Sequence, residues 1–216
     1  MGIVRLVRVG VDLGFIHDPT AIVVVEPFLI TREREQDGAE EYAVSYRVRR
    51  AERLPLGIQV TDAVERVGRI VDALRERHTM ATIEVLVDAT GVGQVVKDLL
   101  RPRVWRKRTM LWPIIITPGQ EPNKKGGTLY VPKEALIQRL AGLLASGQLQ
   151  IPHTEEALLR ELEVFQIKTT PASRKSKFEA APGEHDDLVI ALSLAVWRKV
   201  YPEQLFLRPI RLGIGI

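Results

Sequence analysis

The sequence predicts an α/β domain built on a mixed β-sheet, with antiparallel and parallel strands, flanked by helices. Two patterns support this fold class. Within the first 50 residues, three segments alternate apolar and polar side chains, which is typical of an antiparallel meander. After residue 60, segments with helical spacing alternate with short β-branched runs, which favours strands joined by helices. We expect one domain over residues 1–200 and a C-terminal tail over residues 201–216.

The first predicted strand covers residues 4–13, where valine or leucine occupies every second position from Val7 onward. This strand carries a carboxylate, Asp12, at its end. The segments AIVVVE (21–26) and EYAVSYRVRR (41–50) are expected to be the second and third strands, because both are rich in β-branched or aromatic residues. Three consecutive strands of this kind imply the antiparallel meander.

The next four segments alternate helix and strand. Residues 62–77 place valine, isoleucine and leucine at helical spacing, and TIEVLVD (82–88) is a short β-branched strand that ends at Asp88. The helical segment VVKDLLR (95–101) and the strand LWPIIITPG (111–119) follow. This alternation predicts the parallel part of the sheet.

The last third of the chain is mainly helical. Apolar residues at helical spacing predict amphipathic helices over residues 133–146 and 154–165. Residues 166–183 are rich in Lys, Arg, Ser, Thr and Pro, and we expect a mobile hairpin or loop there. The stretch EHDDLVIALSLAVW (184–197) begins with acidic residues and continues as an apolar helix that is expected to be buried.

The composition excludes several classes of protein. No apolar run approaches the roughly 18 residues that a membrane-spanning helix needs, and residues 1–20 lack the features of a signal peptide. We therefore expect no membrane partner and a cytoplasmic location, which is the host cytoplasm for a viral or prophage protein. Because the chain has no cysteine, a metal would be held by oxygen or imidazole. The net charge of +4 is a weak indication of a polyanionic partner.

Carboxylates occur at three predicted element ends. Asp12 and Asp88 end two strands, while Asp186 and Asp187 precede the apolar part of the last helix. One acid is enough to cap a helix, whereas adjacent like charges repel unless a cation or a buried partner offsets them. Because ligands gather at the carboxyl ends of strands in such sheets, we expect the four aspartates to converge at one edge. For each aspartate alone, a turn-forming or capping role is the alternative.

Such a cluster suits Mg²⁺ or Mn²⁺, which prefer oxygen ligands and retain positions for water and phosphate. Two such ions about 3.5 to 4 Å apart stabilise the attacking and leaving oxygens of a phosphoryl displacement. From its position, Asp12 is expected to bridge both ions. Adjacent helical residues project about 100° apart. One of Asp186 and Asp187 is therefore expected to bind metal directly, and the other is expected to act on the metal ligands without binding the metal itself.

Three segments, in this order, resemble the RNase H-like (retroviral integrase superfamily) nucleases, and more narrowly the nuclease domain of phage terminase large subunits. They are VGVDLGFIHDPTAIVVVE around Asp12, EVLVDATGVG around Asp88, and EHDDLVIALSLA with Asp186 and Asp187. The resemblance covers nearly the whole chain. It implies that the four aspartates are catalytic metal ligands of a Mg²⁺- or Mn²⁺-dependent endonuclease that cuts concatemeric viral DNA during genome packaging.

The same resemblance implies double-stranded DNA as the substrate and a portal or small terminase as partners. A complete large terminase also has an amino-terminal packaging ATPase. This chain contains no G-x-x-x-x-G-K-[ST] segment, and its first motif lies close to Met1. We therefore expect either an excised nuclease domain or a protein that works without such a motor, and a separate packaging ATPase is a further candidate partner.

Basic residues in two predicted loops are candidate phosphate contacts. Lys124 and Lys125 lie in one loop, and Arg174, Lys175 and Lys177 lie before the last helix. Two other functions stay open. One is a Holliday-junction resolvase-like or RNA/DNA-hybrid nuclease with the same fold, and the other is a non-catalytic nucleic-acid-binding or assembly module. A missing acid would indicate the latter, and no acid is missing.

Overall fold

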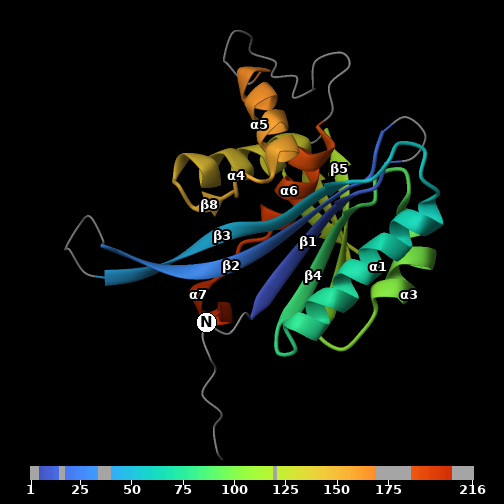
Figure 1. Cartoon of the computed structure of the whole chain (residues 1–216), viewed down its shortest axis with the longest axis horizontal. Helices are drawn as coiled ribbons and strands as arrows, with labels where there is room; N and C mark the ends of the chain where they lie inside the picture. Colours follow the sequence, from blue (N-terminus) through green and yellow to red (C-terminus); the bar gives the residue numbers. More distant parts are fainter. Residues whose placement is uncertain (1–4, 15–17, 34–39, 119–120, 169–185, 206–216) are drawn as a thin grey trace, which may run out of the picture.

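The computed structural model describes residues 5–14, 18–33, 40–118, 121–168 and 186–205. These residues form an eight-stranded sheet with helices on both faces (Figure 1). The predicted fold class, a mixed sheet flanked by helices, is therefore confirmed. In the described part of the chain, no helix is long and apolar enough to cross a membrane.

The sheet has the strand order β6-β7-β5-β4-β1-β2-β3-β8. Its first three strands pair antiparallel as the meander predicts, whereas β1, β4, β5 and β7 run parallel to one another. This arrangement puts β1 at the boundary between the antiparallel and the parallel halves. The strands are β1 (Leu6–Asp12), β2 (Ala21–Glu33), β3 (Glu40–Arg53), β4 (Thr82–Asp88), β5 (Thr109–Thr117), β6 (Asn123–Lys125), β7 (Thr128–Pro132) and β8 (Leu149–Gln150).

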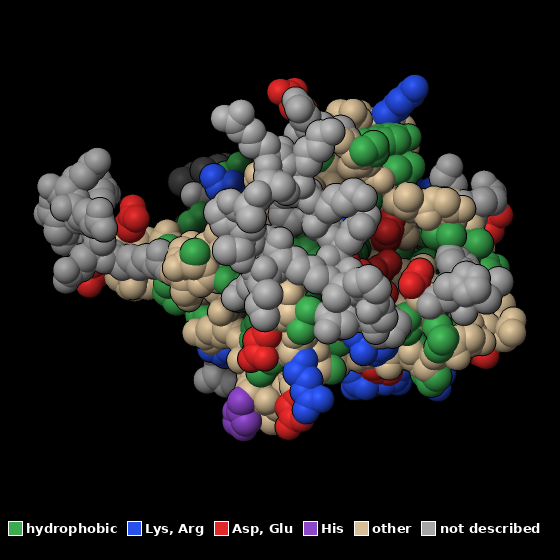
Figure 2. Space-filling model, turned by 90° about the horizontal axis from the view of Figure 1, so that it is seen from above, with side chains coloured by type: hydrophobic (Ala, Val, Ile, Leu, Met, Phe, Trp, Pro, Cys, Tyr) green, Lys and Arg blue, Asp and Glu red, His purple; other side chains and the backbone are tan. Residues whose placement is uncertain are grey.

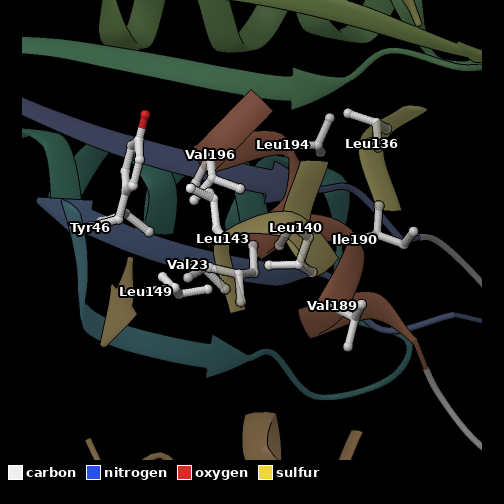
Figure 3. Packing of buried hydrophobic residues seen from close by; sticks show 14 of the residues in the cluster. Val23, Tyr46, Leu136, Leu140, Leu143, Leu149, Val189, Ile190, Leu194 and Val196 are labelled. Carbon is white, nitrogen blue, oxygen red and sulfur yellow. The ribbon is translucent and has the colours of Figure 1, made fainter. Parts of the chain in front are cut away.

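Helices cover both faces of the sheet (Figure 1). One face packs against α1 and the short helical turns after β4. The other packs against α4, α5 and α6, which bury a hydrophobic cluster that Figure 3 shows in part. The helical segments are α1 (Val60–Arg77), α2 (Gly93–Val95), the π-helical turn η1 (Val96–Leu100), α3 (Arg101–Val104), α4 (Lys133–Ala145), α5 (Glu156–Lys168), α6 (Asp187–Trp197) and α7 (Pro202–Leu205).

Several elements differ from the sequence-based expectations. The hairpin β6–β7 and the two-residue β8 are not anticipated, because each is too short to show a periodic pattern. The glycine pair Gly126–Gly127, at φ 57° and 83°, makes the hairpin turn. Lys124 and Lys125 therefore lie in an edge strand, and their placement in a loop is wrong. In the expected irregular tail, α7 packs near β2 and β3, and residues 206–216 lie outside the described residues.

The buried helix α6 crosses β1 at Gly10. A Cβ at Gly10 would overlap the backbone carbonyl of Ala191 in α6, so only glycine permits this approach. Two residues earlier on the same face, the buried Arg8 pairs with Glu84 of β4 at 2.9 Å and donates to the carbonyl oxygen of Arg198 just after α6. The end of α6 is thus fixed against the centre of the sheet.

Candidate active site

Asp12 and Asp88 are the last residues of two neighbouring parallel strands, β1 and β4. The register pairs Val11 with Val87, so the two strands end side by side. Side chains alternate along a strand, and Gly10 faces α6. Asp12 therefore points toward the α6 face, and Asp88 does the same because Leu86 packs in the cluster beneath that helix. Both carboxylates lie at the edge that the sequence predicts.

The start of α6 brings two more carboxylates to this edge. The four aspartates line one cavity of about 620 Å³. Figure 2 shows acidic side chains inside a recess at this end of the molecule. We call this group the carboxylate cluster, and its members are Asp12, Asp88, Asp186 and Asp187.

Helix capping does not explain the acids at the start of α6. Asp186 occupies the N-cap position, but within the described residues its side chain makes no cap hydrogen bond. Instead Glu161 of α5 accepts hydrogen bonds from the backbone N–H groups of Leu188 at 3.0 Å and Val189 at 3.2 Å. A residue from another helix therefore fills the capping role.

Arg53, at the end of β3, connects this cap to the cluster. Its guanidinium pairs with Glu161, and its Nε lies 3.8 Å from Oδ2 of Asp187, a residue that is only 6% exposed. The pair orients the first turn of α6 relative to the sheet. The sequence alone does not indicate a role for either residue, because a glutamate in an amphipathic helix and an arginine at a strand end have the same local pattern as surface charges.

Replacement of Glu161 with alanine is expected to lower the free energy of unfolding by about 2 kcal/mol, because it leaves two helix N–H groups without their acceptor and removes one of the two carboxylates beside Arg53. Glu163→Ala, at an exposed position of the same helix, is the matched control and is expected to change stability by less than about 0.5 kcal/mol. Urea unfolding of both variants measures the difference. Equal losses would contradict the capping role of Glu161.

The carboxylates perturb one another. Burial raises the pKa of Asp12 well above its ordinary value, and the negative charges of Asp88, Asp187 and Asp186 raise it further, while Lys133 opposes them. Burial also raises the pKa of Asp88. Hydrogen bonds that Asp88 accepts from Thr90, one of them from the backbone N–H at 2.7 Å, partly offset this rise. The cluster is therefore a poorly solvated concentration of negative charge, the environment in which a bound cation is most favourable.

The donor atoms of the cluster fit a hard divalent cation, because all of them are carboxylate oxygens. Within the described residues, however, no three His, Cys, Asp or Glu side chains are arranged so that they could hold a metal ion. A protein cation lies there instead: Nζ of Lys133, the first residue of α4, is 3.0 Å from Oδ2 of Asp186. The local sequence around Lys133 does not indicate this contact.

The predicted phosphate contacts lie partly within the described residues. Lys124 and Lys125 are exposed on β6. Lys124 lies in one cross-strand row with Leu129, Ile114 and Asp88. Three strand spacings therefore separate it from Asp88, which is roughly 14 Å. Arg174, Lys175 and Lys177 lie outside the described residues. So does most of the expected loop over 166–183, whose first three residues belong to α5.

No family model matches the sequence, and no curated protein matches it. Among solved structures, the chain is similar to the human cytomegalovirus terminase nuclease domain, soaked with Mn, with a TM-score of 0.52 and 14% identity over 88% of this chain and 81% of that one. The chain has an RNase H-like fold. Thermus thermophilus RuvC is a further similar structure, with a TM-score of 0.40 and 14% identity over 88% of this chain and 91% of RuvC.

In this RNase H-like sheet, the central strand β1 ends at Asp12, with Asp88 on the adjacent parallel strand and the start of α6 above them. The four aspartates of the cluster thus come from elements that are far apart in the sequence.

Proposed function

We propose that the chain is a Mg²⁺- or Mn²⁺-dependent DNA endonuclease of the terminase type. The observation that carries this proposal is the convergence of the carboxylate cluster on one cavity at the carboxyl edge of an RNase H-like sheet. The cap that Glu161 gives to α6 supports it, because Asp186 is then not required for capping. The order of the three sequence motifs and the likeness to a terminase nuclease domain favour the terminase type.

In this proposal, Asp12, Asp88 and at least one of Asp186 and Asp187 hold the metal ions, which supply an activated water and stabilise the charge on the phosphate. Asp12 ends the central strand and is proposed to help hold both ions. Its raised pKa means that metal competes with a proton for this carboxylate. Cleavage is accordingly expected to decrease as the pH falls through that pKa.

Double-stranded DNA is the proposed substrate. Lys124 and Lys125 are proposed phosphate contacts beside the cavity. Lys124 lies on the sheet face that carries Asp88, and Lys125 lies on the other face at the sheet edge. Arg174, Lys175 and Lys177 are proposed as further contacts from the segment before α6. The proposed partners are a portal, a small terminase or a separate packaging ATPase, in the cytoplasm of the host.

The test is cleavage of supercoiled plasmid with Mn²⁺, Mg²⁺ or EDTA. We expect nicking and linearisation with either metal, little sequence preference, and no cleavage in EDTA, because the basic side chains contact phosphates rather than base edges. Four-way junctions and RNA/DNA hybrids are assayed in parallel. Cleavage confined to either one would assign the other nuclease type, and binding to DNA without cleavage of any substrate would indicate a non-catalytic module.

A further inference from the structure

Lys133 is a positive charge inside an otherwise acidic site. It lines the cavity of the carboxylate cluster, and its Nζ lies 3.0 Å from Oδ2 of Asp186. Its charge also acts on Asp12 and Asp88, lowering the pKa of each against the larger effect of burial. Among the described residues that line the cavity, the other charged side chains are all aspartates, and Lys133 is the one cation.

The fold fixes Lys133 at this edge. Strand β7 runs parallel to β5, and the register pairs its last residue, Pro132, with Thr117 at the carboxyl end of β5. Helix α4 starts immediately afterwards, with Lys133 as its first residue and Pro132 as its N-cap. The lysine therefore reaches the cluster from a rigid strand–helix junction rather than from a surface loop.

We infer that Lys133 is an internal counter-ion of the site: its ammonium partly neutralises the carboxylate cluster before metal binds, and it leaves Asp186 when a divalent ion binds there. This inference rests on the proposed function, because it assigns a role toward the metal that the endonuclease would use. Lys133 is thus a positioning residue for the carboxylates, and its ammonium competes with the metal ion for Asp186.

Charge balance supports the replacement of the Lys133 ammonium by a divalent ion at Asp186. The four carboxylates of the cluster repel one another at close range, and one ammonium relieves only part of that repulsion. Two divalent ions bring four positive charges to a cavity that five aspartates line, Asp18 being the fifth, so they neutralise most of its negative charge without the ammonium. A metal ion and the ammonium cannot share Oδ2 of Asp186 without repelling each other. Metal binding is therefore expected to break the contact between Lys133 and Asp186.

An ordinary surface salt bridge is the alternative. The side chains of Lys133 and Asp186 are 33% and 24% exposed, and an isolated pair in solvent contributes little to stability. Such a pair would have little effect on metal affinity. The two interpretations therefore predict different metal affinities when the lysine charge is removed.

The experiment uses Lys133→Gln, which removes the charge and keeps a polar side chain of moderate length. Without metal, we expect a lower melting temperature than that of wild type, because the carboxylates lose their counter-ion. In calorimetric titration with MnCl₂ and no DNA, we expect affinity to rise roughly tenfold, because metal no longer competes with the ammonium. Lys199→Gln is the matched control, since it removes the same charge at an exposed position after α6. It should change neither quantity.

Each result decides one question. A wild-type protein that binds no Mn²⁺ would overturn the proposed function itself. If wild type binds Mn²⁺ and Lys133→Gln binds it with unchanged or weaker affinity, the metal site stands and the counter-ion role of Lys133 is overturned. If Lys133→Gln is unfolded without metal, Mn²⁺ is expected to restore its folding, and failure to do so would also overturn the inference. Lys133→Arg keeps the charge and is expected to bind Mn²⁺ as weakly as wild type.

Discussion

Asp12→Asn is expected to abolish DNA cleavage while DNA binding is retained. Asp12 ends the central strand of the sheet, and its carboxylate lies close enough to Asp88, Asp186 and Asp187 for their charges to raise its pKa. Asparagine has the same shape but no charge to hold a divalent ion. Loss of the metal removes several kcal/mol of transition-state stabilisation, and 4 kcal/mol corresponds to about 10³-fold in rate. Plasmid nicking and filter binding measure the two effects.

The same substitution separates a metal site from a structural aspartate. Because the folded-state pKa of Asp12 is raised, ionised Asp12 lowers the stability of the metal-free protein above that pKa, and stability recovers as the pH falls toward the unfolded value. Asp12→Asn is therefore expected to be as stable as wild type or more stable at neutral pH, by about 1 kcal/mol. This advantage should shrink at lower pH, where wild-type Asp12 is protonated.

Added Mn²⁺ should reverse the order of stability, so that wild type becomes more stable than Asp12→Asn. Metal that binds only the folded state raises the melting temperature of wild type, and Asp12→Asn should gain less because its site lacks one ligand. A turn-forming aspartate predicts the opposite behaviour, in which the substitution costs about 1 kcal/mol and metal has no effect. Full nicking activity in Asp12→Asn would contradict the proposed location of the active site.

The carboxyl-edge position of the aspartates was predictable from local patterns. Period-two alternation through Val7 and Val11 defines β1 and its end at Asp12, and the β-branched run before Asp88 defines β4 in the same way. Chain order and the rule that ligands gather at the carboxyl ends of strands then bring these ends together. The apolar run after Asp187 likewise identifies α6.

Other parts of the site depend on contacts between distant segments, which no local pattern reveals. Glu161 caps a helix 27 residues later in the chain, and Lys133 contacts an aspartate 53 residues away. A capping role for the acids at the start of α6, which the sequence left open as the alternative, rests on a local rule. Among the described residues Asp186 makes no side-chain cap bond and instead contacts the distant Lys133. The β6–β7 hairpin has only three and five residues per strand, so its edge position depends on pairing with β5.

The close approach of α6 to the sheet leaves no room for a side chain at position 10. Gly10→Ala is expected to destabilise the protein by about 3 kcal/mol, because the added methyl group overlaps the backbone of α6 at Ala191. The helix cannot easily move away. Glu161 holds its first turn, and Arg8 bonds the carbonyl of Arg198 beyond its last turn.

If α6 shifts to admit the methyl group, the two aspartates at its start shift with it. Gly10→Ala is therefore expected to weaken Mn²⁺ binding as well as stability, although Gly10 does not line the cavity. The matched control is Gly142→Ala on an exposed face of α4, where an added Cβ meets nothing within 4 Å. There, better helix propensity should stabilise the protein by up to about 1 kcal/mol and leave metal binding unchanged. Denaturant unfolding and MnCl₂ titration of both variants measure this contrast, and a Gly10→Ala protein with wild-type stability and Mn²⁺ affinity would show that α6 placement does not depend on this contact.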